Sequence, residues 1–499
     1  MIEKLWNQVL AHQEVRQSLS NIRKEIKQVE EKKALKHLIA GKENVLMGFL
    51  QDEDAKTRKN AALLMGDLGC QEFLQPLYQA YRAENQLFVK SSYLTAIRSF
   101  DYREYMPELL ERLDELTRTE PAKEDQKHLE EEIRQLSAMK IEMEGTGKHE
   151  FRGINETYDV ILLTNRDHQE ITEQELKSES PDAQTKIFGA GVMAHVNGLR
   201  WAEKVRTYQE LLFVVRGMQE CEMDPQKAAE TIVKSDLMNF LKKGHKGKPP
   251  FYFRIEFKSQ MDLSRRSFFT KKLSSQIEKS TNRELINTTS NYEFEIRLIE
   301  NKLGGCNILL KLFTLEDERF TYRREVSVTS IRPMNVALTV ALAKEYMKED
   351  AQVLDPFCGV GTMLIERYKA VRANTTYGID FDEDCIKKAR LNTAAAHQII
   401  HYVNRDFFDF THDYPFDEII TDMPFRIGRK TEEEIEEIYA RFFPAARKVL
   451  KEHGIIILYT HDRELVKKFS GKTSFLLMKE FEISRKEGTY VMVLKEKLK

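Results

Sequence analysis

The sequence is poor in the residues that build disulfide frameworks and metal sites. Its 499 residues include five cysteines, which lie far apart and form no C-x-x-C pair. Zinc clusters and disulfide-stapled secreted folds both need closely spaced cysteines. We therefore expect no metal ligand set and a reducing, cytoplasmic environment.

Long apolar runs and a strong net charge are also missing. No stretch approaches the ~18 consecutive apolar residues that indicate a membrane-spanning helix, and the start of the chain has no apolar signal-peptide core. The 78 basic and 80 acidic residues nearly cancel, whereas 41% hydrophobic residues suffice to build packed cores. These features predict a soluble protein without a membrane partner, and the length predicts about three domains.

Residues 1–145 place apolar side chains at spacings of three and four, which predicts an all-α region. The segment 49–68 has a weaker echo in 81–100, and helix pairs repeated in this way indicate a short solenoid. The placement of Arg58 and Ala61 in the first copy resembles a HEAT repeat. An ordinary helical bundle is the alternative, because two copies define a period poorly. A solenoid predicts a protein partner for this region.

Residues 150–325 alternate strands with helices, which predicts an α+β domain. The last three expected strands alternate apolar with polar residues, so we expect one face of their sheet to lie in water. An amphipathic helix is expected at 267–280. The expected strands are 158–164, 211–215, 251–257, 292–298 and 306–312.

The most informative stretch predicts a strand, a tight turn and a helix. An apolar strand ends in Asp355, and Gly359 and Gly361 lead into a helix near Thr362. Glycines let the backbone approach a ligand, and unpaired N–H groups at a helix start face it. A dinucleotide fingerprint needs a third glycine where this chain has Leu364, so NAD is disfavoured. A carboxylate at the strand end suits the ammonium group of an amino acid, which S-adenosylmethionine carries.

Three further expected strands of residues 330–499 also end in acids. Asp380 stands where a carboxylate can bind both ribose hydroxyls. Asp406 follows the third strand and is placed to accept from an adenine amine. Asp422 follows the fourth strand and opens the run Asp-Met-Pro-Phe, which includes Pro424 and Phe425.

The order D-P-F-C-G-x-G-T, G-I-D, R-D, D-M-P-F resembles the class I methyltransferases that modify exocyclic amines. It is most similar to the THUMP-domain RNA guanine-N2 methyltransferases, whose fourth motif is Asp or Asn, an apolar residue, Pro, then Phe or Tyr. The resemblance covers residues 155–499. It implies a ferredoxin-like and THUMP-like domain at 150–325 and a Rossmann-like α/β domain at 330–499. This chain has Arg426 where the family usually has Gly, with Gly428 two positions later, so the target base stays open.

The resemblance implies an S-adenosylmethionine-dependent enzyme that methylates the N2 amine of a guanosine in tRNA. An aryl amine needs acceptors that draw its hydrogens, and a stacking surface for its ring. We assign the first role to the Asp422 side chain and the carbonyl beside Pro424, and the second to Phe425. The expected cofactor-binding residues are Asp355, Phe357, Gly359, Gly361, Thr362, Asp380 and Asp406.

Other interpretations of these motifs stay open. The same acceptor logic suits rRNA guanine, adenine N6 or a protein amide, and a decayed transferase fold would leave a non-catalytic RNA-binding assembly factor. Cys358 is expected to fill the turn, because no histidine in the motif activates it. Asn392, His397 and His401 are expected to have capping or surface roles.

A basic tract precedes the catalytic motifs. Between residues 241 and 275, ten lysines and arginines stand against two acids. Beside the aromatic residues 251–253 and upstream of a base-modifying motif, this tract predicts contacts with RNA phosphates, which position the RNA without choosing its sequence. A solvated face is the alternative. The expected RNA-binding residues are Lys242, Lys243, Lys246, Lys248, Arg265, Arg266, Lys271 and Lys272, with Arg323 in the segment that leads out of the domain.

Overall fold

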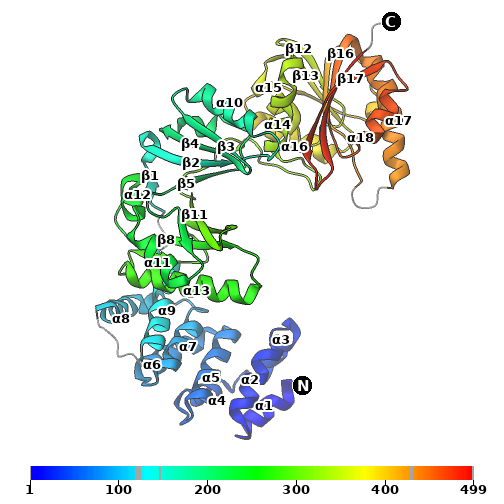
Figure 1. Ribbon diagram of the computed structural model, residues 1–499. Helices are drawn as coiled ribbons and strands as arrows, with labels where there is room; N and C mark the ends of the chain where they lie inside the picture. The colour runs from blue at the N-terminus through cyan, green and yellow to red at the C-terminus, as the bar shows by residue number, and fades with distance from the viewer. Residues whose placement is uncertain (1, 119–124, 145–147, 427–430, 497–499) are drawn as a thin grey trace. The chain divides into compact units, whose positions relative to one another are not determined.

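A computed structural model describes residues 2–118, 125–144, 148–426 and 431–496. The chain divides into two compact units, Met1–Lys148 and His149–Lys499 (Figure 1). Each unit buries its own clusters of hydrophobic side chains. The two units are therefore described separately.

The first unit is helical in all its regular structure, which confirms the predicted all-α region. Helices α5 and α7 cross closely at Gly66, where a Cβ atom would lie 2.7 Å from the Cα atom of Ala96. Trp6 and Tyr93 are among the largest fully buried side chains of this unit. The helices are α1 (Ile2–Leu10), α2 (Val15–Glu25), α3 (Val29–Ile39), α4 (Glu43–Gly48), α5 (Ala55–Leu68), α6 (Leu74–Ala83), α7 (Leu87–Ile97), α8 (Met106–Arg118) and α9 (Gln126–Glu144).

The second unit begins with an α+β part that contains the strands expected from the sequence. Most of its strands form one sheet in the order β3-β4-β2-β5-β11-β10-β8-β9, and β6 pairs with β11. Strands β1 (Glu150–Phe151) and β7 (His245–Lys246) form a separate pair. The remaining elements are β2 (Thr157–Leu163), α10 (Gln169–Glu179), β3 (Gln184–Phe188), β4 (Gly191–Asn197), β5 (Glu210–Val214), β6 (Glu220–Glu222), α11 (Pro225–Lys234), α12 (Leu237–Gly244), β8 (Phe251–Lys258), α13 (Leu263–Ser280), β9 (Leu285–Asn287), β10 (Phe294–Glu300) and β11 (Gly305–Leu312).

The expectation of a wet face on this sheet is wrong for β10. Glu295 and Arg297 are 0% and 4% exposed. Arg297 pairs with Glu295 and with Glu210, each at 2.6 Å, and Arg254 pairs with Glu295 at 2.6 Å. Lys311 adds a contact to Glu210 at 2.7 Å. The alternating polar residues therefore pair with one another, because a buried charge needs a charged or hydrogen-bonding partner.

Two of the three aromatic residues beside the basic tract, 251–253, belong to the core of the sheet. Phe251 and Phe253 are both 0% exposed, because β8 is an inner strand whose odd-numbered side chains point into the core beneath α13. Phe253 stacks on Phe294 with 5.9 Å between ring centroids. Tyr252 is half-buried.

The C-terminal part is a seven-stranded sheet in the order β14-β13-β12-β15-β16-β18-β17. Strands β12 to β16 are parallel, whereas β18 runs antiparallel to β16 and β17. Helices α14 to α16 pack on one face and α17 and α18 on the other. Figure 1 shows these layers in yellow to red. The elements are α14 (Pro333–Ala343), β12 (Ala351–Asp355), α15 (Thr362–Ala370), β13 (Ala373–Asp380), α16 (Glu383–Ala395), β14 (His401–Asn404), β15 (Phe416–Asp422), α17 (Glu432–Val449), β16 (Leu450–Thr460), α18 (Arg463–Ser470), β17 (Phe475–Ser484) and β18 (Thr489–Glu496).

Candidate active site

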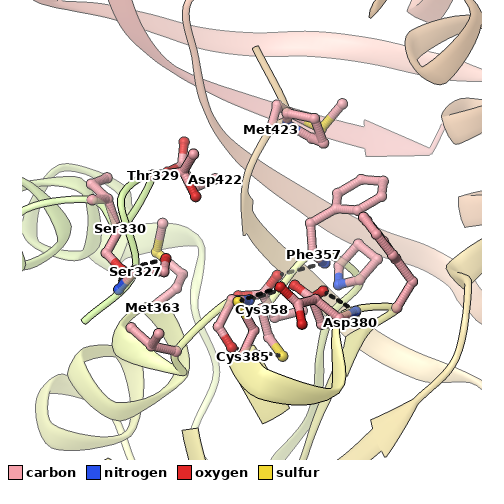
Figure 2. A pocket seen from close by; sticks show the side chains of 18 of the residues that line it. Ser327, Thr329, Ser330, Phe357, Cys358, Met363, Asp380, Cys385, Asp422 and Met423 are labelled. Carbon is pink, nitrogen blue, oxygen red and sulfur yellow. Dashed lines mark hydrogen bonds between the residues drawn. The ribbon is translucent and has the colours of Figure 1, made fainter. Parts of the chain in front are cut away.

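A cavity of about 310 Å³ opens at the carboxyl ends of β12, β13 and β15. The strand order reverses between β12 and β15, and open α/β sheets bind their ligands at such a point. Figure 2 shows Asp422, Met423 and Asp380 among the side chains around this cavity. Of the expected catalytic and cofactor-binding residues, Gly361 alone lies outside the lining, which includes Asp355, Phe357, Gly359, Thr362, Asp380, Asp406, Asp422, Pro424 and Phe425.

Both glycines of the turn have left-handed backbone conformations, with φ of 49° at Gly359 and 84° at Gly361. A Cβ atom on Gly361 would lie 2.3 Å from the Tyr402 hydroxyl, whereas one on Gly359 would meet no atom within 4 Å. The Tyr402 hydroxyl shares a hydrogen bond of 2.7 Å with Thr393. Gly361 therefore faces the side chain of Tyr402, and this explains why it does not line the cavity.

Asp355 is only 1% exposed, at the point where β12 ends. Its Oδ1 atom accepts from the Phe357 N–H at 3.1 Å and from the Thr421 hydroxyl at 2.6 Å. Burial raises the pKa of Asp355 to about 7, although these two hydrogen bonds oppose the rise. An ammonium group bound beside this carboxylate would compensate its buried negative charge.

The other two expected cofactor acids differ in burial and contacts. Asp380 accepts through Oδ2 from the Gly359 N–H and through Oδ1 from the Asp382 N–H, each at 2.9 Å. It therefore holds the glycine turn against β13 while it lines the cavity (Figure 2). Asp406 is exposed and accepts from the Phe408 N–H at 2.9 Å.

Two buried polar atoms of the cavity wall have no hydrogen-bond partner within the described residues. They are Thr362 Oγ1, at the start of α15, and Asp422 Oδ1, at the end of β15. Burial raises the pKa of Asp422 well above its usual range, and the neighbouring Asp355 adds to this shift. Buried polar groups normally find partners, so unpaired ones in a cavity indicate a ligand. Together with the carboxylates of Asp355 and Asp380, they form a polar set that fits the ammonium and hydroxyl groups of S-adenosylmethionine.

The Phe425 ring stacks on the ring of His461, with centroids 4.1 Å apart and 24° between the planes. His461 follows β16 and is half-buried. Burial lowers the pKa of His461, although a hydrogen bond with the Glu487 backbone and the charge of Asp462 oppose this. Sequence reasoning missed His461, because it stands alone beyond the recognised motifs.

The segment that joins the two parts of the second unit forms another wall of the cavity, through Ser327, Thr329, Ser330 and Ile331. Asn392 ties this segment to the glycine turn: its Nδ2 atom donates to the carbonyls of Glu325 at 2.9 Å and Val360 at 3.1 Å. No motif marks the wall residues, so they could not be identified from the sequence.

The expectation of a capping or surface role is wrong for Asn392, which is 0% exposed. Its Oδ1 atom accepts from the Glu325 N–H at 2.9 Å, so both ends of its amide contact the joining segment. A buried amide needs such partners, and no residue close to Asn392 in the sequence supplies them. His397 and His401 are both exposed.

A buried ion pair links the α+β part to the helix that follows the glycine turn. Arg206 contacts both carboxylate oxygens of Glu366 at 2.7 Å, and the Tyr322 hydroxyl donates to Glu366 at 2.6 Å. Arg206 also donates to the carbonyl of Arg319 at 2.7 Å. Glu366 lies in α15 and its side chain is 1% exposed. This contact sets the α+β part relative to the cavity.

The expected RNA-binding residues fall into two groups on different elements. Lys242 and Lys243 end α12, and Lys246 and Lys248 follow them, whereas the other four of the tract lie on α13. All are exposed except Arg266, which is half-buried. Lys242 pairs with Glu284 at 3.1 Å and Arg265 with Asp262 at 3.3 Å.

Arg323 is placed differently from the tract. It is half-buried and donates to the carbonyl of Ile331 at 3.0 Å. Its side chain therefore braces the wall of the cavity.

Within the described residues, no three His, Cys, Asp or Glu side chains gather as ligands for a metal ion. None of the helices in the described parts of the chain has the length and apolar character needed to cross a membrane. Arg426 is exposed and pairs with Glu432 at 2.5 Å. Gly428 lies outside the described residues.

Comparison with known sequences gives a match for the C-terminal part. Residues 323–490 match the sequence model of the family described as RMKL-like, methyltransferase domain. A tRNA (guanine(10)-N2)-dimethyltransferase of Methanothermobacter thermautotrophicus is 31% identical over 120 residues. This match covers 22% of the chain and 33% of the relative, so the chain spans about a third of that relative's length.

Solved structures extend the likeness in fold. TrmN from Thermus thermophilus aligns with 68% of this chain and 99% of its own, at 16% identity and a TM-score of 0.52. The protein SMU.472, solved in complex with SAH, aligns with 69% of this chain and 99% of its own, at 13% identity and a TM-score of 0.53. The chain is thus a multidomain protein whose C-terminal part has the class I methyltransferase fold, and this fold implies S-adenosylmethionine as the cofactor.

Proposed function

We propose that the protein is an RNA methyltransferase that transfers a methyl group to the exocyclic N2 amine of a guanosine in tRNA. The observation that carries the proposal is the buried, unpartnered Oδ1 atom of Asp422, in the wall of a cavity that Asp355 and Phe425 also line. The matched tRNA methyltransferase supports the choice of substrate.

The chemistry of an aryl amine explains this arrangement. When bound, S-adenosylmethionine supplies an electrophilic methyl carbon on a sulfonium. Asp422 accepts a hydrogen bond from the amine, stabilises the positive charge that develops on its nitrogen, and takes up the proton that the nitrogen releases. The raised pKa of Asp422 suits this last step. Fixed groups also hold the nitrogen in line with the methyl carbon, which is the main demand of the displacement.

The glycine turn, Asp355 and Asp380 supply the cofactor side of the cavity. Asp355 is placed to bind an ammonium group and Asp380 a pair of ribose hydroxyls. Thr362 Oγ1 offers a further hydrogen bond at the first residue of α15. The target base enters from the side of Phe425, and a base in a stem must flip out of its helix to reach Asp422.

The α+β part supplies affinity for RNA in this proposal. Exposed lysines at the end of α12 and along α13 form basic surfaces that suit a phosphate backbone. The same part is where the sequence resembles the THUMP module. Because phosphate contacts carry no sequence information, the choice of nucleotide depends on the cavity and on its fixed position relative to these surfaces.

The test is transfer of tritiated methyl groups from S-adenosylmethionine into total tRNA and rRNA, followed by nucleoside analysis. Label in N2-methylguanosine of tRNA, lost with Asp422→Ala, is the expected result. Label in rRNA alone would make rRNA the substrate in place of tRNA. Label in N6-methyladenosine would make adenine N6 the methylated amine in place of guanine N2. Cofactor binding without label in any RNA would overturn the proposal and favour a protein amide substrate or a non-catalytic role.

A further inference from the structure

Phe425 and His461 leave the sheet from neighbouring parallel strands. Asp422, the last residue of β15, stands opposite Tyr459 in β16, and the Met423 N–H donates to the Tyr459 carbonyl at 2.9 Å. The carboxyl ends of parallel strands meet at one edge of the sheet, so the residues that follow them become neighbours. This register brings the two rings to their stacking distance of 4.1 Å.

The ring of His461 is a fixed support, because its own chain is held on both sides. The hydroxyl of Thr460 shares a hydrogen bond of 2.7 Å with Tyr439 and accepts from the Asp462 N–H at 2.9 Å. Tyr459 meets the His461 ring edge-on, with 6.1 Å between centroids and 81° between planes. The His461 side chain therefore has little freedom to follow a moving Phe425.

The two rings have different places relative to the cavity. Phe425 lines it, whereas the lining does not include His461. His461 thus covers one face of the Phe425 ring and leaves the other face for a ligand. A base that enters the cavity can stack on Phe425 from one side only, which fixes the plane in which its amine approaches Asp422.

We propose that His461 is a positioning residue, which holds the Phe425 ring parallel to the incoming base and makes the site selective for planar aromatic amines over aliphatic amides. This inference rests on the proposed function, in which Phe425 stacks on the acceptor. Aromatic rings prefer defined stacked geometries, and a ring backed by a second ring keeps its orientation when the acceptor leaves. Without His461, each incoming base would have to fix the orientation of the Phe425 ring again, which would lower the affinity for the base.

The first test compares His461→Ala and His461→Phe with the natural protein in steady-state methylation of RNA. Loss of one aromatic pair should lower kcat/KM for RNA by about two- to twelvefold in the alanine variant. The phenylalanine variant restores the stack and should regain the natural value. Affinity for S-adenosylmethionine, measured by calorimetry, should stay unchanged in both, which also shows that both variants fold.

A second readout is independent of methyl transfer. The fluorescence of 2-aminopurine riboside falls when its base stacks, so we expect quenching by the natural protein and His461→Phe, and weaker quenching by His461→Ala, in the presence of S-adenosylhomocysteine. If no RNA is methylated but this order holds, the proposed function fails and the role of His461 stands. An alanine variant equal to the natural protein in both readouts, or a phenylalanine variant as impaired as alanine, would overturn the inference.

Discussion

Arg206 and Glu366 form a two-point ion pair at 2.7 Å that joins the α+β part to helix α15. Glu366 is buried and Arg206 is half-buried, and the Tyr322 hydroxyl donates to the Glu366 carboxylate at 2.6 Å. Helix α15 begins at the glycine turn. The contact therefore fixes the α+β part, with its basic surfaces, relative to the cavity. In the proposed function, this contact sets the distance between the RNA-binding surfaces and the amine that is methylated.

Removal of one partner of this pair should destabilise the second unit. We expect Glu366→Gln to lower its stability by about 3 kcal/mol, because Arg206 would keep a buried charge without a carboxylate. Thermal unfolding measures the loss. The matched control is Glu179→Gln, which removes the more exposed pair with Lys204 and should cost under ~1 kcal/mol. Equal losses in both variants would contradict a coupling role for Glu366.

Asp422→Ala should lower methyl transfer by about 10²- to 10³-fold, because the site loses its fixed acceptor for the amine. Asp422→Asn keeps one acceptor oxygen and should lose less. Both variants remove a carboxylate whose Oδ1 atom is buried without a partner, so we expect melting temperatures at or above that of the natural protein. A lower melting temperature in both would indicate a structural role for Asp422.

Cofactor affinity should depend on pH through Asp355. Its raised pKa of about 7 means that a proton must leave before the carboxylate can bind an ammonium group. Affinity should fall several-fold from pH 7 to pH 6 and about tenfold for each further unit. Calorimetry in buffers of different ionisation enthalpy should detect the released proton. Asp355→Asn should bind weakly, with only the pH dependence of the ligand itself.

The two turn glycines should respond differently to alanine. Gly361→Ala places a Cβ atom 2.3 Å from the Tyr402 hydroxyl, in addition to backbone strain, whereas Gly359→Ala adds strain alone. We expect the first to weaken cofactor binding and stability more than the second, which should cost about 1 to 2 kcal/mol. Adding Tyr402→Phe should recover part of the loss at Gly361. No recovery would show that the backbone alone requires this glycine.

RNA binding should lose salt dependence when α13 loses charge. Lys271→Ala with Lys272→Ala should lower the slope of log K against log salt by roughly 0.7 to 0.9 for each lysine removed. Lys467→Ala with Lys468→Ala is the matched control, because Glu480 and Glu436 already pair with these residues at 2.7 and 2.5 Å. Filter binding at several salt concentrations measures both. If the two double variants had equal slopes, the surface that binds RNA would not include α13.

Much of the catalytic fold was predictable, because its signals are local. Buried parallel strands appear as short apolar runs, and an acid after each run marks the carboxyl edge of the sheet, as Asp355, Asp380 and Asp422 do. The positions of these acids around one cavity follow from strand direction alone. A protein partner for the helical region stays a prediction.

The missed features all depend on contacts between distant residues. Alternation in β10 showed which residues are polar, but the burial of Glu295 and Arg297 depends on partners in other strands. Phe251 lies in the core because β8 is an inner strand, and strand order is not a local property. The stacking of His461 on Phe425 likewise needs the register of β15 and β16.

The amide of Asn392 shows where the smallest cofactor-binding fragment must begin. A fragment cut at residue 330, the boundary that the motifs predict, would lack Ser327 and Thr329 from the wall of the cavity. It would also lack Glu325, so Asn392 would keep only its bond to the glycine turn and face water at its other end. A fragment that keeps the cavity wall and both contacts of Asn392 with Glu325 must therefore begin before residue 325.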